Sequence, residues 1–334
     1  MGLGFDVGTY NLVCCSRDDK GNFVNKREVN AFLELPLENR FVFNMMKNAG
    51  VPLIERENVA YALGEAAVNM AYTMSQLELK RPMAHGCVNP KEKDAFQILS
   101  IMVHSLLDGV KKDNETLYYS VPANAINEET DADYHAKVLE AIFKAYKSEE
   151  GFKVNAMPIN EALALVYAEL GKKAYTGIGI SFGAGMVNLC YAMYGQPVFT
   201  FAIVNSGDWI DKQAAKATGE TATFINKEKT KIDLSKAPTS LVERAIQTQY
   251  RIMIEHTITG IKKGLAGAQK AVHSENPVDI VVAGGTSCPY GFATLFKEVL
   301  VQANLPIKVG EVVKPNDPLY SVARGCLIAA EAAK

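Results

Sequence analysis

The sequence predicts an α/β fold built from two similar halves. Strand-like and helix-like segments alternate along its 334 residues, which is the pattern of α/β domains. Two glycine turns, at residues 5–11 and 180–186, each follow one apolar run and lead into another, and a third glycine element occupies residues 283–287. Glycine lets the backbone approach a phosphate closely and present N–H groups to it. The three elements together therefore predict a duplicated domain that clamps a nucleotide between its halves.

The bulk composition is that of a globular protein and excludes several classes. A length of 334 residues with 48% hydrophobic and 22% charged residues suffices for two domains, each with its own core. A net charge of −2 gives no general attraction to nucleic acid or anionic lipid. No apolar run approaches the ~20 residues of a membrane helix. Because the first motif begins within five residues of Met1, no signal peptide is expected.

The six cysteines show no C-x-x-C spacing, which argues against a zinc or iron–sulfur site and against a disulfide framework. We therefore expect a protein of the reducing cytoplasm.

Several elements are expected in the first half. Residues 91–112 carry apolar side chains at helical spacing, and residues 132–146 have a similar pattern. Residues 117–121 predict a buried strand that Pro122 ends, and residues 153–157 predict another strand. Pro158 is expected to open a helix that stops at Gly171.

The second half is expected to repeat this scheme. Its elements are three strands over 177–204 with turns at 183–185 and 195–197, a helix from about 206–208, a long helix over 239–269, a strand over 278–283 and a final helix over 317–333. Residues 31–70 and 219–238 fit the alternation poorly, so we expect them to be inserted subdomains. The expected domains are 1–158 with 317–334, which would carry the insertion of about 31–70, and 159–316, which would carry an insertion extending over about 219–258.

Seven motifs carry a resemblance to a known superfamily. In chain order they occupy residues 6–11, 81–88, 121–123, 159–164, 206–211, 283–287 and 321–326. Together they resemble the motifs of actins, sugar kinases and DnaK-type chaperones, in particular those of bacterial actins of the MreB and MamK type. The resemblance implies duplicated actin-like (ribonuclease H-like) domains with a nucleotide cleft between them. His85 departs from the pattern, because an acid is usual at that position.

The resemblance also implies a site for ATP or ADP with Mg²⁺. Asp6 would hold the metal, mainly through water, and would act in catalysis with Glu161, which would orient the attacking water. Two plainer interpretations are that Asp6 caps its own turn and that Glu161 is a solvated acid favoured by its helix dipole. The residues expected to bind the nucleotide are Gly8, Thr9, Tyr10, Asn11, Ser181, Gly183, Ala184, Gly185, Gly207, Asp208, Lys231, Gly284, Gly285 and Thr286. For Lys231, a charged surface turn is an equal alternative.

The second glycine turn departs from the family pattern in two places. Ser181 stands where an acid normally helps to organise the metal and the attacking water, and Met186 replaces a hydroxyl residue. Nucleotide binding through backbone donors should survive these changes, whereas hydrolysis should be slow.

The function that the resemblance implies is a cytoplasmic filament protein that binds Mg-ATP and polymerises with itself. A chaperone would need a substrate-binding domain, and a sugar kinase would need a catalytic aspartate in a sugar cleft. A dehydratase activator would need cluster cysteines. A nucleotide-dependent chaperone or kinase of the same fold and a non-hydrolysing scaffold remain the alternatives. Direct binding of nucleic acid is not expected, no membrane-binding segment fits before Gly4, and any cargo adaptor is undefined.

Overall fold

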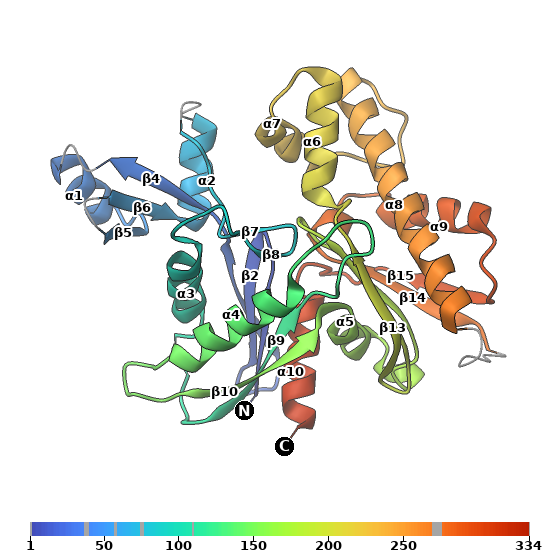
Figure 1. The fold of residues 1–334 in the computed structure, drawn as a ribbon, viewed down its shortest axis with the longest axis horizontal. Coiled ribbons are helices and arrows are strands. Elements are labelled where there is room, and N and C mark those ends of the chain that lie inside the picture. Colours follow the sequence, from blue (N-terminus) through green and yellow to red (C-terminus); the bar gives the residue numbers. More distant parts are fainter. Residues whose placement is uncertain are drawn as a thin grey trace.

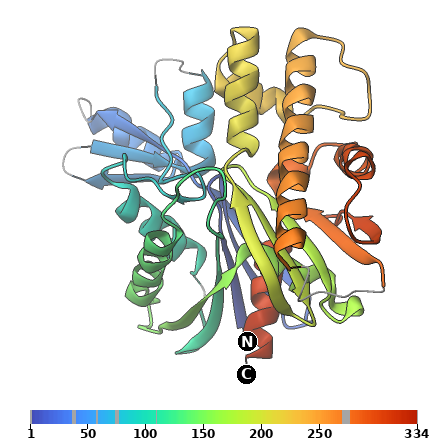
Figure 2. The ribbon, with the colours of Figure 1, turned by 45° about the vertical axis from the view of Figure 1, so that its right-hand side comes forward.

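The computed structural model describes residues 2–36, 40–56, 59–73, 77–108, 110–268 and 276–333. These residues form two α/β halves that lie side by side, with two helices crossing between them at the base (Figure 1). The two chain ends lie close together beside these crossing helices in both ribbon views (Figures 1 and 2). No helix in the described ranges has the length and apolar character needed to cross a bilayer.

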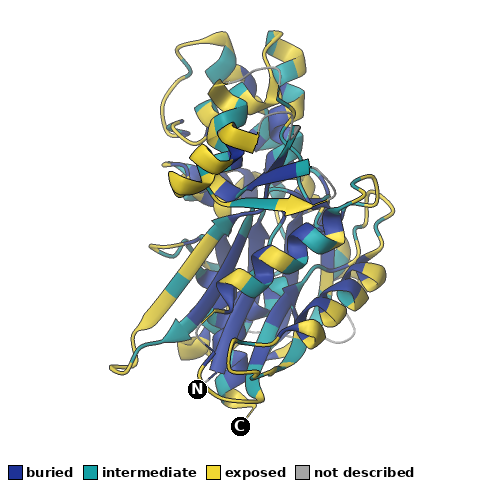
Figure 3. Cartoon of the chain, turned by 90° about the vertical axis from the view of Figure 1, so that its left-hand side faces the viewer, coloured by how far each residue is buried: buried dark blue, intermediate teal, exposed yellow. Residues whose placement is uncertain are grey.

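The first half is built on a five-stranded sheet with strand order β10-β9-β1-β2-β3. Its elements are β1 (Gly2–Val7), β2 (Asn11–Arg17), β3 (Phe23–Val29), β9 (Glu115–Val121), β10 (Val154–Asn160), α3 (Ala95–Leu106) and α4 (Ala132–Ala145). Strand β1 runs antiparallel to β2 and parallel to β9. The apolar faces of α3 and α4 pack against this sheet to form one core. The central strands are accordingly buried along their length, whereas buried and exposed residues alternate along the helices (Figure 3).

The second half repeats this arrangement with strand order β13-β12-β11-β14-β15. Its elements are β11 (Gly177–Phe182), β12 (Val187–Met193), β13 (Gln196–Ile203), β14 (Val278–Ala283), β15 (Val309–Val313), α8 (Leu241–Ala268), α9 (Phe292–Ala303) and the 3₁₀ turns η1 (Gly171–Lys173) and η2 (Gly285–Ser287). Strand β11 pairs antiparallel with β12 and parallel with β14, as β1 does with β2 and β9. The predicted duplicated α/β fold is therefore confirmed at the level of strand order and direction.

Each half carries an additional unit at the upper end of the molecule (Figure 2). In the first half a three-stranded sheet of order β4-β6-β5 is flanked by two helices. Its elements are β4 (Phe32–Pro36), α1 (Arg40–Asn48), β5 (Leu53–Arg56), β6 (Val59–Leu63) and α2 (Gly64–Thr73). In the second half the unit contains α6 (Gly207–Thr218) and α7 (Ala222–Lys229). A two-stranded ribbon, β7 (Met83–Ala84) and β8 (Cys87–Val88), follows the first unit along the chain and precedes α3.

Two helices, α5 (Glu161–Glu169) and α10 (Ser321–Ala332), cross between the halves. Their close approach depends on glycine. A Cβ atom added to Gly325 would lie 1.7 Å from the carbonyl oxygen of Ala164. A Cβ on Gly4 of β1 would lie 2.1 Å from Ala323 O of α10, and one on Gly179 of β11 would lie 2.6 Å from Ala162 O of α5. The two halves are therefore alike here: α10 packs on β1 at Gly4, and α5 packs on β11 at Gly179.

Most predicted elements occur, with shifted ends. The helix expected over 91–112 is α3, which covers 95–106, and the long helix expected over 239–269 is described for 241–268. The prediction that Pro158 opens a helix is wrong. Pro158 lies inside β10, paired with Tyr119 of β9, and α5 begins at Glu161 with Asn160 as its N-cap. Strand β10 is at the sheet edge, where a residue without an N–H is tolerated.

Candidate nucleotide-binding site

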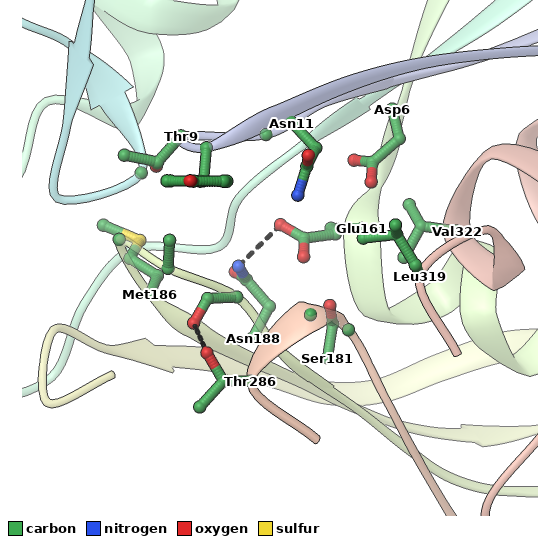
Figure 4. A pocket seen from close by; sticks show the side chains of 18 of the residues that line it. Asp6, Thr9, Asn11, Glu161, Ser181, Met186, Asn188, Thr286, Leu319 and Val322 are labelled. Atoms are coloured by element: carbon green, nitrogen blue, oxygen red, sulfur yellow. Dashed lines mark hydrogen bonds between the residues drawn. The ribbon is translucent and has the colours of Figure 1, made fainter. Parts of the chain in front are cut away.

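A cavity of about 270 Å³ opens between the two halves. Residues from β1, the two glycine turns, α5, α7, η2 and the start of α10 line it. Figure 4 shows Glu161 near its centre, with Asp6 and Asn11 on the side of the first half and Ser181 and Asn188 on the side of the second. The cavity therefore collects side chains that are far apart in the sequence.

The first glycine turn, residues 8–10, closes the β1–β2 hairpin. The N–H of Gly8 donates to the carbonyl of Asn11 over 3.0 Å, and a Cβ on Gly8 would lie 2.7 Å from that oxygen. Asn30, which is fully buried, holds the turn from behind. Its side-chain amide donates to the carbonyl of Gly8 (3.0 Å) and its backbone N–H to the carbonyl of Tyr10 (2.8 Å). With its carbonyls engaged outside, the turn is placed to direct N–H groups into the cavity.

The second glycine turn, residues 183–185, has the same construction. Gly183 N–H donates to the carbonyl of Met186 over 2.9 Å, and a Cβ on Gly183 would lie 2.8 Å from that oxygen. Its carbonyls are again engaged by neighbouring groups. The Thr286 hydroxyl donates to Gly183 O over 2.7 Å, and the N–H of Asp208, in the first turn of α6, donates to Ala184 O over 2.8 Å.

The two turns approach each other across the cavity. A Cβ on Gly185 would lie 2.3 Å from the Thr9 hydroxyl oxygen and 2.5 Å from the N of Gly86. Only a residue without a side chain fits between the halves at this point.

Two carboxyl groups face the cavity at its base, and burial raises the pKa of each. The pKa of Asp6 rises to about 6 through burial, although the Ser120 hydroxyl, which donates to Asp6 Oδ1 over 2.8 Å, opposes the rise. Burial, and then the negative charge of Asp6, raise the pKa of Glu161 to about 8. These surroundings differ from those of a solvated helix acid. Burial therefore favours the protonated forms of both groups, and a cation bound beside them would favour the charged forms.

Asn188 of β12 orients Glu161. Its Nδ2 donates to Glu161 Oε2 over 2.7 Å, while its Oδ1 accepts the Ala123 N–H over 2.9 Å. Because the Ala123 N–H can bond only to the oxygen, the amide nitrogen must point at the carboxyl group. Sequence reasoning missed this residue. The available signal was one amide in an otherwise apolar strand, Val187–Met193, where a buried polar side chain needs partners.

Helix α7 supplies a cation to the wall of the cavity. Lys229 is buried, and its Nζ lies 2.8 Å from Asp211 Oδ1 and 2.8 Å from the Gly207 carbonyl oxygen. Asn226, one turn earlier, donates to Asp211 Oδ2 over 2.8 Å. Lys229, Asn226 and Thr230 line the cavity, but the sequence did not point to them.

Thirteen of the sixteen residues named from the sequence line the cavity: Asp6, Gly8, Thr9, Tyr10, Asn11, Glu161, Ser181, Gly183, Ala184, Gly185, Gly284, Gly285 and Thr286. The other three lie outside its lining. Gly207 supports the second turn through its N–H, which donates to Gly183 O over 3.2 Å. The Asp208 carboxylate pairs with Arg81, and Lys231 pairs with Glu228 at the exposed end of α7. Whether each of the sixteen binds a nucleotide stays a prediction.

A model of the volactin protein family matches residues 1–330. The chain belongs to the volactin family. No curated protein matches the sequence.

Solved structures of actin-like proteins share the fold. A MamK double helical filament superposes with a TM-score of 0.67 at 18% identity over 98% of both chains. MreB5 of Spiroplasma citri bound to ADP gives a TM-score of 0.67 at 16% identity over 99% of this chain and 96% of that one. The ethanolamine utilization protein EutJ from Carboxydothermus hydrogenoformans gives 0.54 at 18% identity, over 98% and 89%. The predicted actin-like fold is thereby confirmed.

Proposed function

We propose that this volactin-family protein binds Mg-ATP between its two halves and polymerises with itself into filaments, and that it hydrolyses the bound ATP slowly. The observation that carries the proposal is the pair of glycine turns of identical construction that face each other across one cavity. Two such turns can surround a chain of phosphates from both sides. Structures with this fold have been solved with ADP and with AMPPNP.

The residues present fit both the nucleotide and the metal. Asn11 contributes a buried Oδ1 without a hydrogen-bond partner in the described residues, and this atom belongs to a side chain that lines the cavity. Asp6 and Glu161 are oxygen donors, and Mg²⁺ in nucleotide sites is held by one or two carboxylates together with phosphates and water. A bound Mg²⁺ would supply the positive charge that these carboxylates lack and would neutralise charge on the phosphates.

In this proposal each side chain has a separate task. Asp6, held by Ser120, would hold the metal through water, and Glu161, held by Asn188, would orient the attacking water. Leu319 and Val322 give the cavity an apolar wall beside Gly285, which suits a nucleoside. The two domains would be 1–158 with 317–334, and 159–316.

Self-assembly is supported by the fold. MamK, which has this architecture over nearly the whole chain, forms a double helical filament. We propose a cytoplasmic homopolymer whose cargo or adaptor protein is not defined by the chain.

Asp6 provides the first test, because its proposed role depends on the metal. Asp6→Asn should weaken binding of Mg-ATP by about tenfold or more, the scale for a group that supports a metal through its outer shell. Binding of ATP in excess EDTA should change little. Titration calorimetry in both buffers measures the difference, and Asp19→Asn, which changes an exposed acid, is the matched control. A folded Asp6→Asn protein with wild-type affinity for Mg-ATP would remove Asp6 from the metal site.

A further inference from the structure

We propose that Arg81 is a positioning residue that ties the two glycine turns together across the cleft through Asp208. The inference rests on the proposed nucleotide site and adds to it a link that controls how tightly that site closes.

On the side of the first half, Arg81 is tied to the first turn. Its guanidinium carbon lies 5.0 Å from the centre of the Tyr10 ring, a cation–π distance. Tyr10 is the third residue of that turn, and its carbonyl is fixed by Asn30. A displacement of Arg81 therefore acts on the turn through the Tyr10 ring.

On the side of the second half, Asp208 is tied to the second turn. One guanidinium nitrogen of Arg81 lies 2.8 Å from both carboxylate oxygens of Asp208. The backbone N–H of the same Asp208 donates to the carbonyl of Ala184, and the Ser206 hydroxyl donates to that oxygen too. One continuous set of contacts thus runs from Tyr10 through Arg81 and Asp208 to Ala184.

The ion pair between Arg81 and Asp208 is partly buried, which strengthens the attraction between the two charges. The side chains of Arg81 and Asp208 are 24% and 22% exposed, so solvent screens them less than it screens an open surface pair. Burial would raise the pKa of Asp208, but Arg81, with help from Lys229 and Lys212, lowers it overall. Both side chains line a second cavity of about 330 Å³, which shares Tyr10, Gly185 and Asn226 with the first. The pair therefore occupies the outer part of the cleft, beyond the position proposed for the nucleotide.

The decisive experiment is a double-mutant cycle on release of a fluorescent ADP analogue. Arg81→Gln and Asp208→Asn should each speed release about fivefold to tenfold, which corresponds to about 1–1.4 kcal/mol. The double variant should release no faster than either single variant, because both remove the same link. Arg81→Lys should restore part of the effect, since it keeps the charge. Asp208→Asn leaves the backbone bond to Ala184 in place, so it isolates the carboxylate.

Arg17→Gln is the matched control. Arg17 forms a hydrogen-bonded ion pair with Glu331 at 2.7 Å and 3.0 Å, and the two side chains are 31% and 33% exposed. That pair joins β2 to α10 without reaching the second half, so its loss should leave nucleotide release unchanged.

A second measurement needs no nucleotide. Amide hydrogen exchange of the unliganded protein should be faster in residues 8–11 and 183–186 of Arg81→Gln than in the wild type, and unchanged in Arg17→Gln. Unchanged release and exchange in folded variants, or additive effects in the double variant, would overturn the role of Arg81. A wild-type protein that binds no nucleotide would instead overturn the proposed function, and the exchange experiment would still test the link.

Discussion

At the scale of single residues, the second glycine hairpin lacks a negative charge that the first one has. Asp6 and Ser181 occupy the same place in their hairpins, two positions before the first glycine, yet only Asp6 carries a carboxylate. Ser181 is buried beside Glu161. Its hydroxyl lowers the pKa of that acid, but by less than burial and the charge of Asp6 raise it. The second turn therefore contributes no negative charge for a metal or for a water molecule.

This difference predicts slow hydrolysis that a single substitution can accelerate. Ser181→Asp should raise the rate of phosphate release by about tenfold to a hundredfold, the scale of one preorganised electrostatic group. Ser181→Asn, which has nearly the same shape without the charge, should not. Glu161→Gln should abolish most of the residual rate, because the amide cannot accept the proton of water. The measurement is phosphate release per mole of bound ATP. Equal rates in Ser181→Asp and Ser181→Asn would reject the explanation.

The raised pKa of Glu161 predicts a pH-dependent stability of the unliganded protein. Glu161 binds a proton more tightly in the folded state than in the unfolded state, where its pKa is near the ordinary value of 4.5. Between that value and about 8 the unfolded state therefore holds fewer protons, and the free energy of unfolding falls as pH rises. Glu161→Gln should flatten this slope, whereas Glu150→Gln, in an exposed turn, should not. Denaturant unfolding at pH 5, 6.5 and 8 tests this, and an unaltered slope in Glu161→Gln would show that Glu161 titrates normally.

At the scale of elements, the crossing of α5 and α10 sets the distance between the halves. Both helices present small residues at the crossing, and the carbonyl of Ala164 occupies the space where a Gly325 side chain would begin. Because α10 packs on the sheet of the first half and α5 on that of the second, the contact between the helices fixes how the two glycine turns face each other.

Gly325→Ala should therefore destabilise the protein by about 1–3 kcal/mol, the usual effect of overpacking, or more if the helices must separate. Gly267→Ala is an informative control in α8, because a Cβ there meets no atom within 4 Å. That variant should gain about 0.5–1 kcal/mol from helix propensity. Urea unfolding of both variants gives the comparison. A neutral Gly325→Ala would mean that the helices do not pack as described.

The sequence predicted the elements that depend on neighbouring residues and missed those that depend on distant ones. The glycine hairpins are local, since each closes on itself within four residues, and they were placed correctly. The start of α5 was misplaced at Pro158 because the pairing of β10 with β9 depends on a strand more than 30 residues away. Lys229 was missed in favour of Lys231 because the orientation of α7 decides which lysine turns inward. The pairing of Arg81 with Asp208 gave no local signal, since 127 residues separate them.

At the scale of the whole molecule, side chains of the described residues bridge the upper cleft. Besides Arg81 and Asp208, the Lys227 ammonium lies 3.3 Å from the centre of the Tyr72 ring, between α7 and α2. Lower down, the segment after β9 joins β13 through backbone bonds from Ala202 to Asn124 and from Ile126 to Ala202. A ligand held by both glycine turns would add to these contacts, so we expect nucleotide to favour the closed arrangement of the halves.

The central claim is that nucleotide bound between the halves drives assembly. The most direct measurement is sedimentation of the purified chain with electron microscopy of the pellet, in Mg-ATP, in Mg-ADP and without nucleotide. We expect filaments in Mg-ATP and little or no polymer without nucleotide, and Asp6→Asn should require more protein to assemble. A wild-type protein that binds Mg-ATP yet stays monomeric at tens of micromolar across a range of salt concentrations would contradict the claim.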